Sequence, residues 1–149
     1  MRPLFCYLGI FGGVLLFTGC SAKSIGIGQG GLSPCPKSPN CVSSQAQDEK
    51  HRIEPLPYRG TRLQARENIK AALAKMDNVT IVTETDDYLH VEFRSRWFKF
   101  VDDVEFWFPE NSSLIHIRSA SRLGYGDLGV NRKRTEQIRM LFTELEGRS

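Results

Sequence analysis

Four strand-like runs separated by short turns constrain this chain more than any other feature. Residues 79–84 and 88–98 are separated by 85–87, a turn of hairpin length. Apolar and polar residues alternate in the second run, and they alternate again over 103–108 and 115–122. Because tight turns make consecutive strands pair side by side, the sequence predicts a four-stranded antiparallel meander with one apolar face.

Helical patterns flank these strands on both sides. Thr61 followed by Gln64 is a capping-box pattern, and apolar residues at helical spacing predict a helix over 62–76. Asn131 is the expected N-cap of a second helix, over about 132–145. The expected fold class is therefore α+β: helix, four-stranded antiparallel meander, helix, with both helices packed on one face of the sheet.

The N-terminal residues have the layout of an export signal. Arg2 precedes an uncharged run over 4–17, which is shorter than the about 20 apolar residues of a bilayer-spanning helix. Phe17-Thr18-Gly19-Cys20 resembles the lipobox of bacterial lipoproteins. This resemblance implies cleavage before Cys20, acylation of Cys20 with chains such as palmitate, and an exported, membrane-anchored protein. Ser21 after the cysteine implies an outer-membrane location facing the periplasm.

These observations divide the chain into three parts. Residues 1–19 are the expected signal peptide, 20–34 the acylated cysteine with a flexible Gly/Ser tether, and 35–149 a single globular domain. The formal net charge of +3 is too small to indicate nucleic-acid binding.

Cys35 and Cys41 are the two remaining cysteines of the expected domain. An oxidising compartment, an even count and short spacing favour a disulfide. A metal site would need two further thiolate or imidazole ligands, and the three histidines show no such spacing. We expect neither a metal nor a cofactor.

The second face of the predicted sheet is polar. It carries His90, Glu92, Arg94, Arg96, Asp103, Glu105, Trp107, His116 and Arg118. We interpret it as a solvated face with cross-strand ion pairs, in preference to a binding face. Trp107 favours the binding alternative, because a large ring is unusual on a wet surface.

The glycine-rich segment 119–131 connects a strand to a helix N-terminus, where free N–H groups attract anions. A shaped turn in which Asp127 and Asn131 cap the helix is the structural alternative, and we favour it. The first turn of this helix carries Arg132, Lys133 and Arg134, and the helix dipole disfavours positive charge there. We expect a negative charge to balance them, supplied by Asp127, Asp102, Asp103 or an anionic ligand. The candidate ligand-binding residues are Asp102, Asp103, Ser119, Ser121, Arg122, Asp127, Asn131 and Arg134.

We assign no catalytic residue. Ser121 with His116 is the best pair for a hydrolase, but the sequence has no nucleophile elbow and no metalloprotease helix. We therefore expect a binding or envelope-assembly module, with a Ser/His hydrolase as the alternative. The expected partners are a membrane, through the anchor, and an anionic small molecule or an envelope protein.

Two stretches, Cys-Pro-Lys-Ser-Pro-Asn-Cys-Val-Ser-Ser over 35–44 and the glycine-rich 118–132, resemble a bacterial domain family of unknown function, as does 102–106. The resemblance covers about 32–146 and implies one domain without implying an activity. We hypothesise that the cysteine loop lies beside the glycine-rich loop and forms one surface with Asp102, Asp103 and Arg134.

Overall fold

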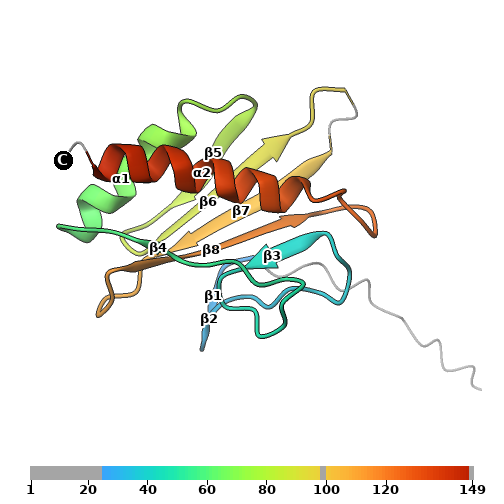
Figure 1. Ribbon diagram of the computed structural model, residues 1–149, viewed down its shortest axis with the longest axis horizontal. Helices are drawn as coiled ribbons and strands as arrows, with labels where there is room; N and C mark the ends of the chain where they lie inside the picture. The colour runs from blue at the N-terminus through green and yellow to red at the C-terminus, as the bar shows by residue number, and fades with distance from the viewer. Residues whose placement is uncertain (1–24, 98–99, 148–149) are drawn as a thin grey trace, which may run out of the picture.

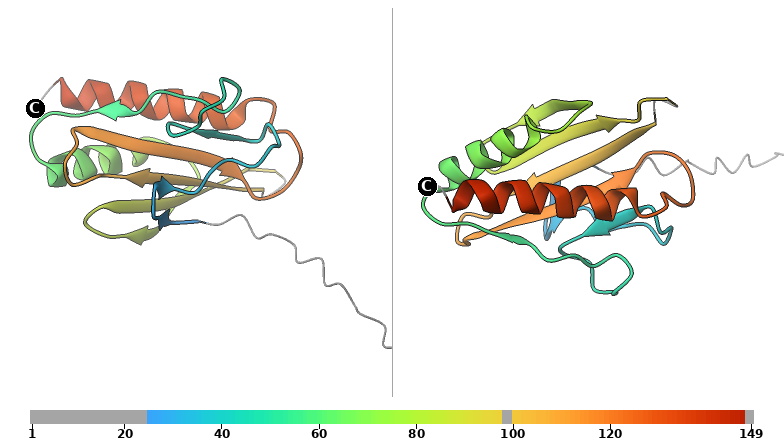
Figure 2. Two further views of the ribbon diagram at one scale, coloured as in Figure 1. Left: turned by 90° about the horizontal axis from the view of Figure 1, so that it is seen from below. Right: turned by 45° about the horizontal axis from the view of Figure 1, so that its top comes forward.

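The computed structural model describes residues 25–97 and 100–147. The expected signal peptide and Cys20 lie outside the described residues. The described chain has three layers (Figures 1 and 2): two helices, an antiparallel sheet, and a short hairpin on the other face of that sheet. The predicted α+β fold is confirmed, with the helices contacting each other and the sheet.

Four consecutive strands form the body of the sheet: β5 (Val79–Glu84), β6 (Tyr88–Arg94), β7 (Val101–Trp107) and β8 (Leu114–Ser121). Each pairs antiparallel with the next, as the tight turns predict. Two short strands that the sequence did not predict, β3 (Cys41–Ser43) and β4 (Leu56–Pro57), pair with the free edge of β8. A proline is tolerated in β4 because the strand lies at an edge.

β6 is shorter than the predicted run over 88–98, and Trp97, which lies within that run, is 83% exposed. The strand ends because Ser95 closes a turn with Phe100. The Ser95 N–H donates to the Phe100 carbonyl at 2.8 Å, and the Phe100 N–H donates to Ser95 Oγ at 2.9 Å.

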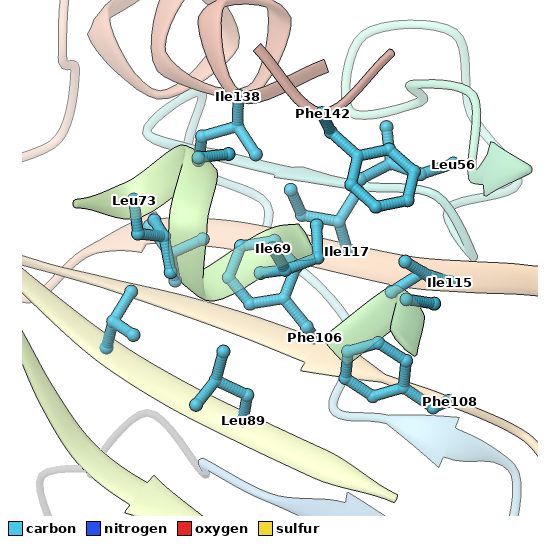
Figure 3. Close-up of a cluster of buried hydrophobic side chains, with 14 of the residues drawn as sticks. Leu56, Ile69, Leu73, Leu89, Phe106, Phe108, Ile115, Ile117, Ile138 and Phe142 are labelled. Atoms are coloured by element: carbon cyan, nitrogen blue, oxygen red, sulfur yellow. The ribbon is translucent and has the colours of Figure 1, made fainter. Parts of the chain in front are cut away.

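The hydrophobic core lies between the helices and the sheet (Figure 3). Ile69 of α1 (Arg62–Leu73) and Ile138 of α2 (Val130–Glu146) pack over Phe106 and Ile117 of the central strands. All four side chains are fully buried. Burial of each such side chain stabilises the fold by about 1.5–3 kcal/mol.

α1 begins as predicted and ends earlier. Thr61 Oγ1 accepts the N–H of Gln64 at 3.2 Å, which confirms the N-cap. Ala74 is the C-cap, and its N–H still bonds to the Lys70 carbonyl, but the N–H groups of Lys75 and Met76 bond to carbonyls only three residues back.

The N-cap of α2 is Gly129, with a left-handed φ of 76°, and the prediction of Asn131 was wrong. Asp127 supplies the cap, because its carboxylate accepts the N–H groups of Gly129 at 3.0 Å and Asn131 at 2.9 Å. The side chain of Asn131 is buried inside the domain instead.

Residues that the sequence placed in the tether form a hairpin. β1 (Ile27–Gly28) pairs with β2 (Gly31–Leu32), and β2 contacts β7 and β8 on the face opposite the helices (Figure 2). A pair of two-residue strands is not stable alone, so its docking on the sheet holds it in place. Within residues 25–97 and 100–147, no helix is both long and apolar enough to span a bilayer.

Candidate functional site

Asn131 is the centre of a buried hydrogen-bond network at the start of α2. Its Oδ1 accepts from Ser119 Oγ at 2.5 Å and from Arg134 Nη1 at 2.8 Å. Its Nδ2 donates to Ser121 Oγ at 2.9 Å and to the Asn40 carbonyl at 3.1 Å. Four residues that the sequence selected therefore meet here, together with Asn40, which it did not select.

The network joins the cysteine loop to the glycine-rich loop. Cys35 and Cys41 form the predicted disulfide. The side chain of Asn40 donates to the Gly124 carbonyl at 2.5 Å, and the Ser121 N–H donates to the Asn40 carbonyl at 3.0 Å. The two loops are thus in contact, as hypothesised.

Protein groups bind two of the three cations in the first turn of α2. Arg134 Nη2 lies 2.6 Å from Asp102 Oδ2, and Arg132 donates to the backbone carbonyls of Lys50 and Arg52. Asp127 adds a carboxylate at the N-terminus, where the helix dipole favours negative charge. Backbone and side-chain hydrogen bonds from Asn131 and Gly129 outweigh the effect of burial and lower the pKa of Asp127.

Asp103 and Arg122 lie on the opposite face of the sheet. Grouping Asp103 with Asp102 and Arg134 was wrong, because successive residues of a strand face opposite sides. Asp103 Oδ1 is 2.8 Å from His90 Nε2, and both carboxylate oxygens accept from Arg122, at 2.8 and 2.9 Å. Burial alone raises the pKa of Asp103, but the bonds from His90 and Arg122 outweigh it and lower the pKa to about 2.

The centre of that polar face is buried, so the expectation of a solvated face was wrong. Glu105 and Arg118 are both buried, with Arg118 Nη1 at 2.6 Å from Glu105 Oε2. Glu105 Oε1 accepts from the Tyr88 hydroxyl at 2.8 Å and from the Gly26 N–H at 2.7 Å. Burial, and then the charge of Glu105, raise the pKa of Tyr88. The N-terminal hairpin is therefore docked on an ion pair.

Gly31 lets the hairpin approach the sheet. Its φ is +112°, and a Cβ atom there would lie 2.6 Å from Cζ3 of Trp107. Gln45 holds the hairpin from the other side, because its Oε1 accepts the Leu32 N–H at 2.8 Å and its Nε2 donates to the Gly30 carbonyl at 3.0 Å.

A cleft of about 660 Å³ lies between residues 28–35 and residues 43–48. His116 lines it, with Nδ1 3.1 Å from Ser44 Oγ and its ring stacked on Trp107 at a centroid distance of 5.4 Å. Burial lowers the pKa of His116, so the imidazole is neutral at neutral pH. Asp48 is the one ionised side chain among the described residues that line the cleft.

Ser44 Oγ also accepts the Ile117 N–H at 3.0 Å, which leaves the serine proton to bond to His116. The pair expected from the sequence, Ser121 with His116, does not form, because these residues face opposite sides of β8. Sequence reasoning missed Ser44 because its position beside His116 follows from the unpredicted pairing of β3 with β8.

The two sites differ in what they offer a ligand. Around Asn131 the polar groups bond to one another, so we interpret that network as a structural brace. The cleft is open space lined by polar side chains and by backbone groups of the hairpin, and it is our candidate functional site.

The chain belongs to the family described as Protein of unknown function (DUF1499), which matches residues 31–142. The match covers both loops and the whole sheet, together with Ser44 and His116. No curated protein and no solved structure matches the chain.

Proposed function

For this member of a family of unknown function, we propose a lipid-anchored envelope module that binds a small, uncharged polar ligand. The observation that carries the proposal is the cleft beside Ser44 and His116. Its volume of about 660 Å³ lies within the range of about 300–1,000 Å³ that is usual for small-molecule sites.

The lining indicates the class of ligand. Gln29, Gln47 and Ser33 contribute uncharged polar side chains, and the glycines of the hairpin contribute backbone groups. The described lining carries neither lysine nor arginine, and His116 is neutral. Such a surface favours a neutral, hydroxyl-rich ligand over an anion. A saccharide of the cell envelope has this chemistry and is available in the proposed compartment.

Binding is testable with chitooligosaccharides, which are neutral N-acetylglucosamine oligomers. Calorimetry on the purified protein should give saturable binding that Ala46→Phe abolishes, because Ala46 lines the cleft and a larger side chain fills it. Ala71→Phe is the matched control, since Ala71 is exposed on α1. Equal affinity in both variants would contradict the assignment of the cleft.

The lipobox-like residues 17–20 support the anchor, and Ser21 supports an outer-membrane location facing the periplasm. Mass spectrometry of the mature protein should show an acylated N-terminal Cys20. Cys20→Ala should leave the chain unprocessed and without the acyl anchor. A processed, firmly membrane-bound Cys20→Ala protein would contradict this part of the proposal.

A hydrolase is the second candidate, because Ser44 and His116 lie within hydrogen-bond distance in the cleft. A neutral imidazole accepts the serine proton, as nucleophilic catalysis requires. A fluorophosphonate probe distinguishes the two functions. Labelling that is lost in Ser44→Ala indicates a catalytic serine, whereas an unlabelled protein that binds saccharide indicates a binding module.

A further inference from the structure

Six large apolar side chains are exposed at one end of the sheet. Five belong to the β6–β7 and β8–α2 connections, which Figure 1 shows at the same end, and Val130 is the first residue of α2. Phe100, Leu123 and Val130 line one hollow of about 280 Å³, so the two connections form a single surface. We call this surface the apolar end; it comprises Trp97, Phe100, Leu123, Tyr125, Leu128 and Val130.

The exposure is too high and too concentrated to be incidental. Leu128 is 96% exposed, Trp97 83% and Tyr125 76%. Isolated exposed apolar residues are normal, but a contiguous patch marks an interaction site. The loop is also held in place, because Asp127 bonds to the N–H groups on either side of residue 130 and to the side chain of Asn131.

The backbone of Leu128 is a second, independent observation. Its φ is +52°, in the left-handed region that a leucine rarely adopts. The side chain gains no packing in return, since it is almost completely exposed. A strained conformation that displays an apolar side chain indicates a function outside the isolated fold.

The chemistry of the apolar end fits the surface of a bilayer. Trp and Tyr rings concentrate at the headgroup level of membranes, and cations beside them attract anionic lipids. The guanidinium of Arg96 lies 5.9 Å from the ring centre of Trp97, and Lys133 is exposed beside Val130. Cations therefore lie beside the patch, whereas the carboxylates that line its hollow are already bonded, Asp102 to Arg134 and Asp127 to the start of α2.

The short chain before the domain would keep the domain close to a membrane. The described structure begins at Ile25, which is five positions after Cys20 in the sequence. Five extended residues span at most about 18 Å. An acylated Cys20 therefore keeps Ile25 within about 18 Å of the bilayer and the domain close to the membrane surface.

We propose that the apolar end inserts into the headgroup layer of the anchoring membrane and fixes the orientation of the domain on it. This inference rests on the lipid anchor of the proposed function. Lipid anchoring alone leaves the domain free to rotate. A second contact with the membrane, made by Trp97, Tyr125 and Leu128, fixes the direction in which the cleft faces.

The test uses the mature acylated protein in vesicles of phosphatidylethanolamine and phosphatidylglycerol with brominated acyl chains. Bromine quenches tryptophan emission on contact. We expect quenching that disappears in Trp97→Phe, because the other tryptophan, Trp107, lies under Gly31. Leu128→Asp should lower the insertion equilibrium constant by about tenfold, since it removes one leucine from the buried set. Met140→Asp, at an exposed apolar position on α2, is the matched control.

Two results would overturn this inference alone: an acylated protein without quenching, and equal quenching in Leu128→Asp and Met140→Asp. A dimer in sedimentation experiments that Leu128→Asp dissociates would also overturn it, because the apolar end would then bind a second copy of the chain. Absence of acyl chains on Cys20, read by mass from the same sample, would overturn both this inference and the proposed anchor.

Discussion

Asn131→Ala removes the centre of the buried brace, and the structure gives its cost. Arg134 keeps its ion pair with Asp102, and the Asn40 carbonyl keeps the Ser121 N–H. The buried Ser119 hydroxyl, however, loses its acceptor, at about 1–3 kcal/mol. The Nδ2 bonds to Ser121 Oγ and to the Asn40 carbonyl are also lost, and each contributes about 1 kcal/mol net. The better helix propensity of alanine offsets about 0.6 kcal/mol of this loss. The expected loss is about 3 kcal/mol.

Such a loss is a large part of the about 5–15 kcal/mol that stabilises a typical domain. Urea unfolding followed by tryptophan fluorescence should show a midpoint lowered by about 1.5 M, for a slope of about 2 kcal/mol per molar urea. Gln137→Ala, on the exposed side of the same helix, should change stability by less than about 0.5 kcal/mol. Equal midpoints for these two variants would refute the assignment of Asn131 as a brace.

Asn131→Asp tests the same geometry through charge. Nδ2 of Asn131 lies 2.7 Å from Asp127 Oδ2, so a carboxylate at position 131 would place two negative charges in contact. We expect the variant to be destabilised at pH 7 and to recover part of the loss as acidification protonates the pair. A deficit independent of pH would contradict this placement.

Three further predictions concern the face under the hairpin. Gly31→Ala should release the hairpin and speed amide exchange at residues 27–32, because its Cβ would collide with the ring of Trp107. Gly28→Ala is the control and should leave exchange unchanged, since its Cβ would meet nothing closer than 4.0 Å. Equal exchange in the two variants would contradict the docking of the hairpin. The depressed pKa of Asp103 contributes about 2 kcal/mol to the free energy of unfolding, a value reduced for solvent screening because the side chain of its partner Arg122 is 40% exposed. This contribution is present above pH about 4 and is lost as the pH falls toward 2. Urea midpoints over this range should fall more steeply for the wild type than for Asp103→Asn, and parallel curves would disprove the linkage. Glu105→Gln leaves Arg118 buried without a counter-charge and should cost about 3–5 kcal/mol by thermal unfolding; a change below about 1 kcal/mol would show that the pair is not needed.

Local signals account for the parts of the fold that the sequence predicted. The alternation of apolar and polar residues within 79–122 is a property of each strand by itself, and tight turns leave little choice of strand pairing. The antiparallel meander could therefore be predicted directly from the sequence. The Thr61 cap and the Cys35–Cys41 disulfide are local in the same way. The placement of Ser119 and Ser121 on the helix side of β8 follows from the strand period of two.

The parts that were missed depend on contacts between distant segments. Ser44 meets His116 only because β3 pairs with β8, and three-residue strands carry no readable pattern. The burial of Glu105 depends on a glycine-rich hairpin whose composition is that of a tether. Asn131 was assigned to the cap because its position fits that role, but its amide reaches Asn40, a residue far away in the chain.

The central claim is that the cleft beside Ser44 and His116 binds a neutral saccharide. The most direct measurement is an NMR titration of isotope-labelled protein with chitooligosaccharide, which reports where a ligand lies. We predict shift changes that saturate and that cluster at residues 28–35, at residues 43–48 and at His116. Shift changes confined to residues 122–130, or none at a saturating concentration, would contradict the claim.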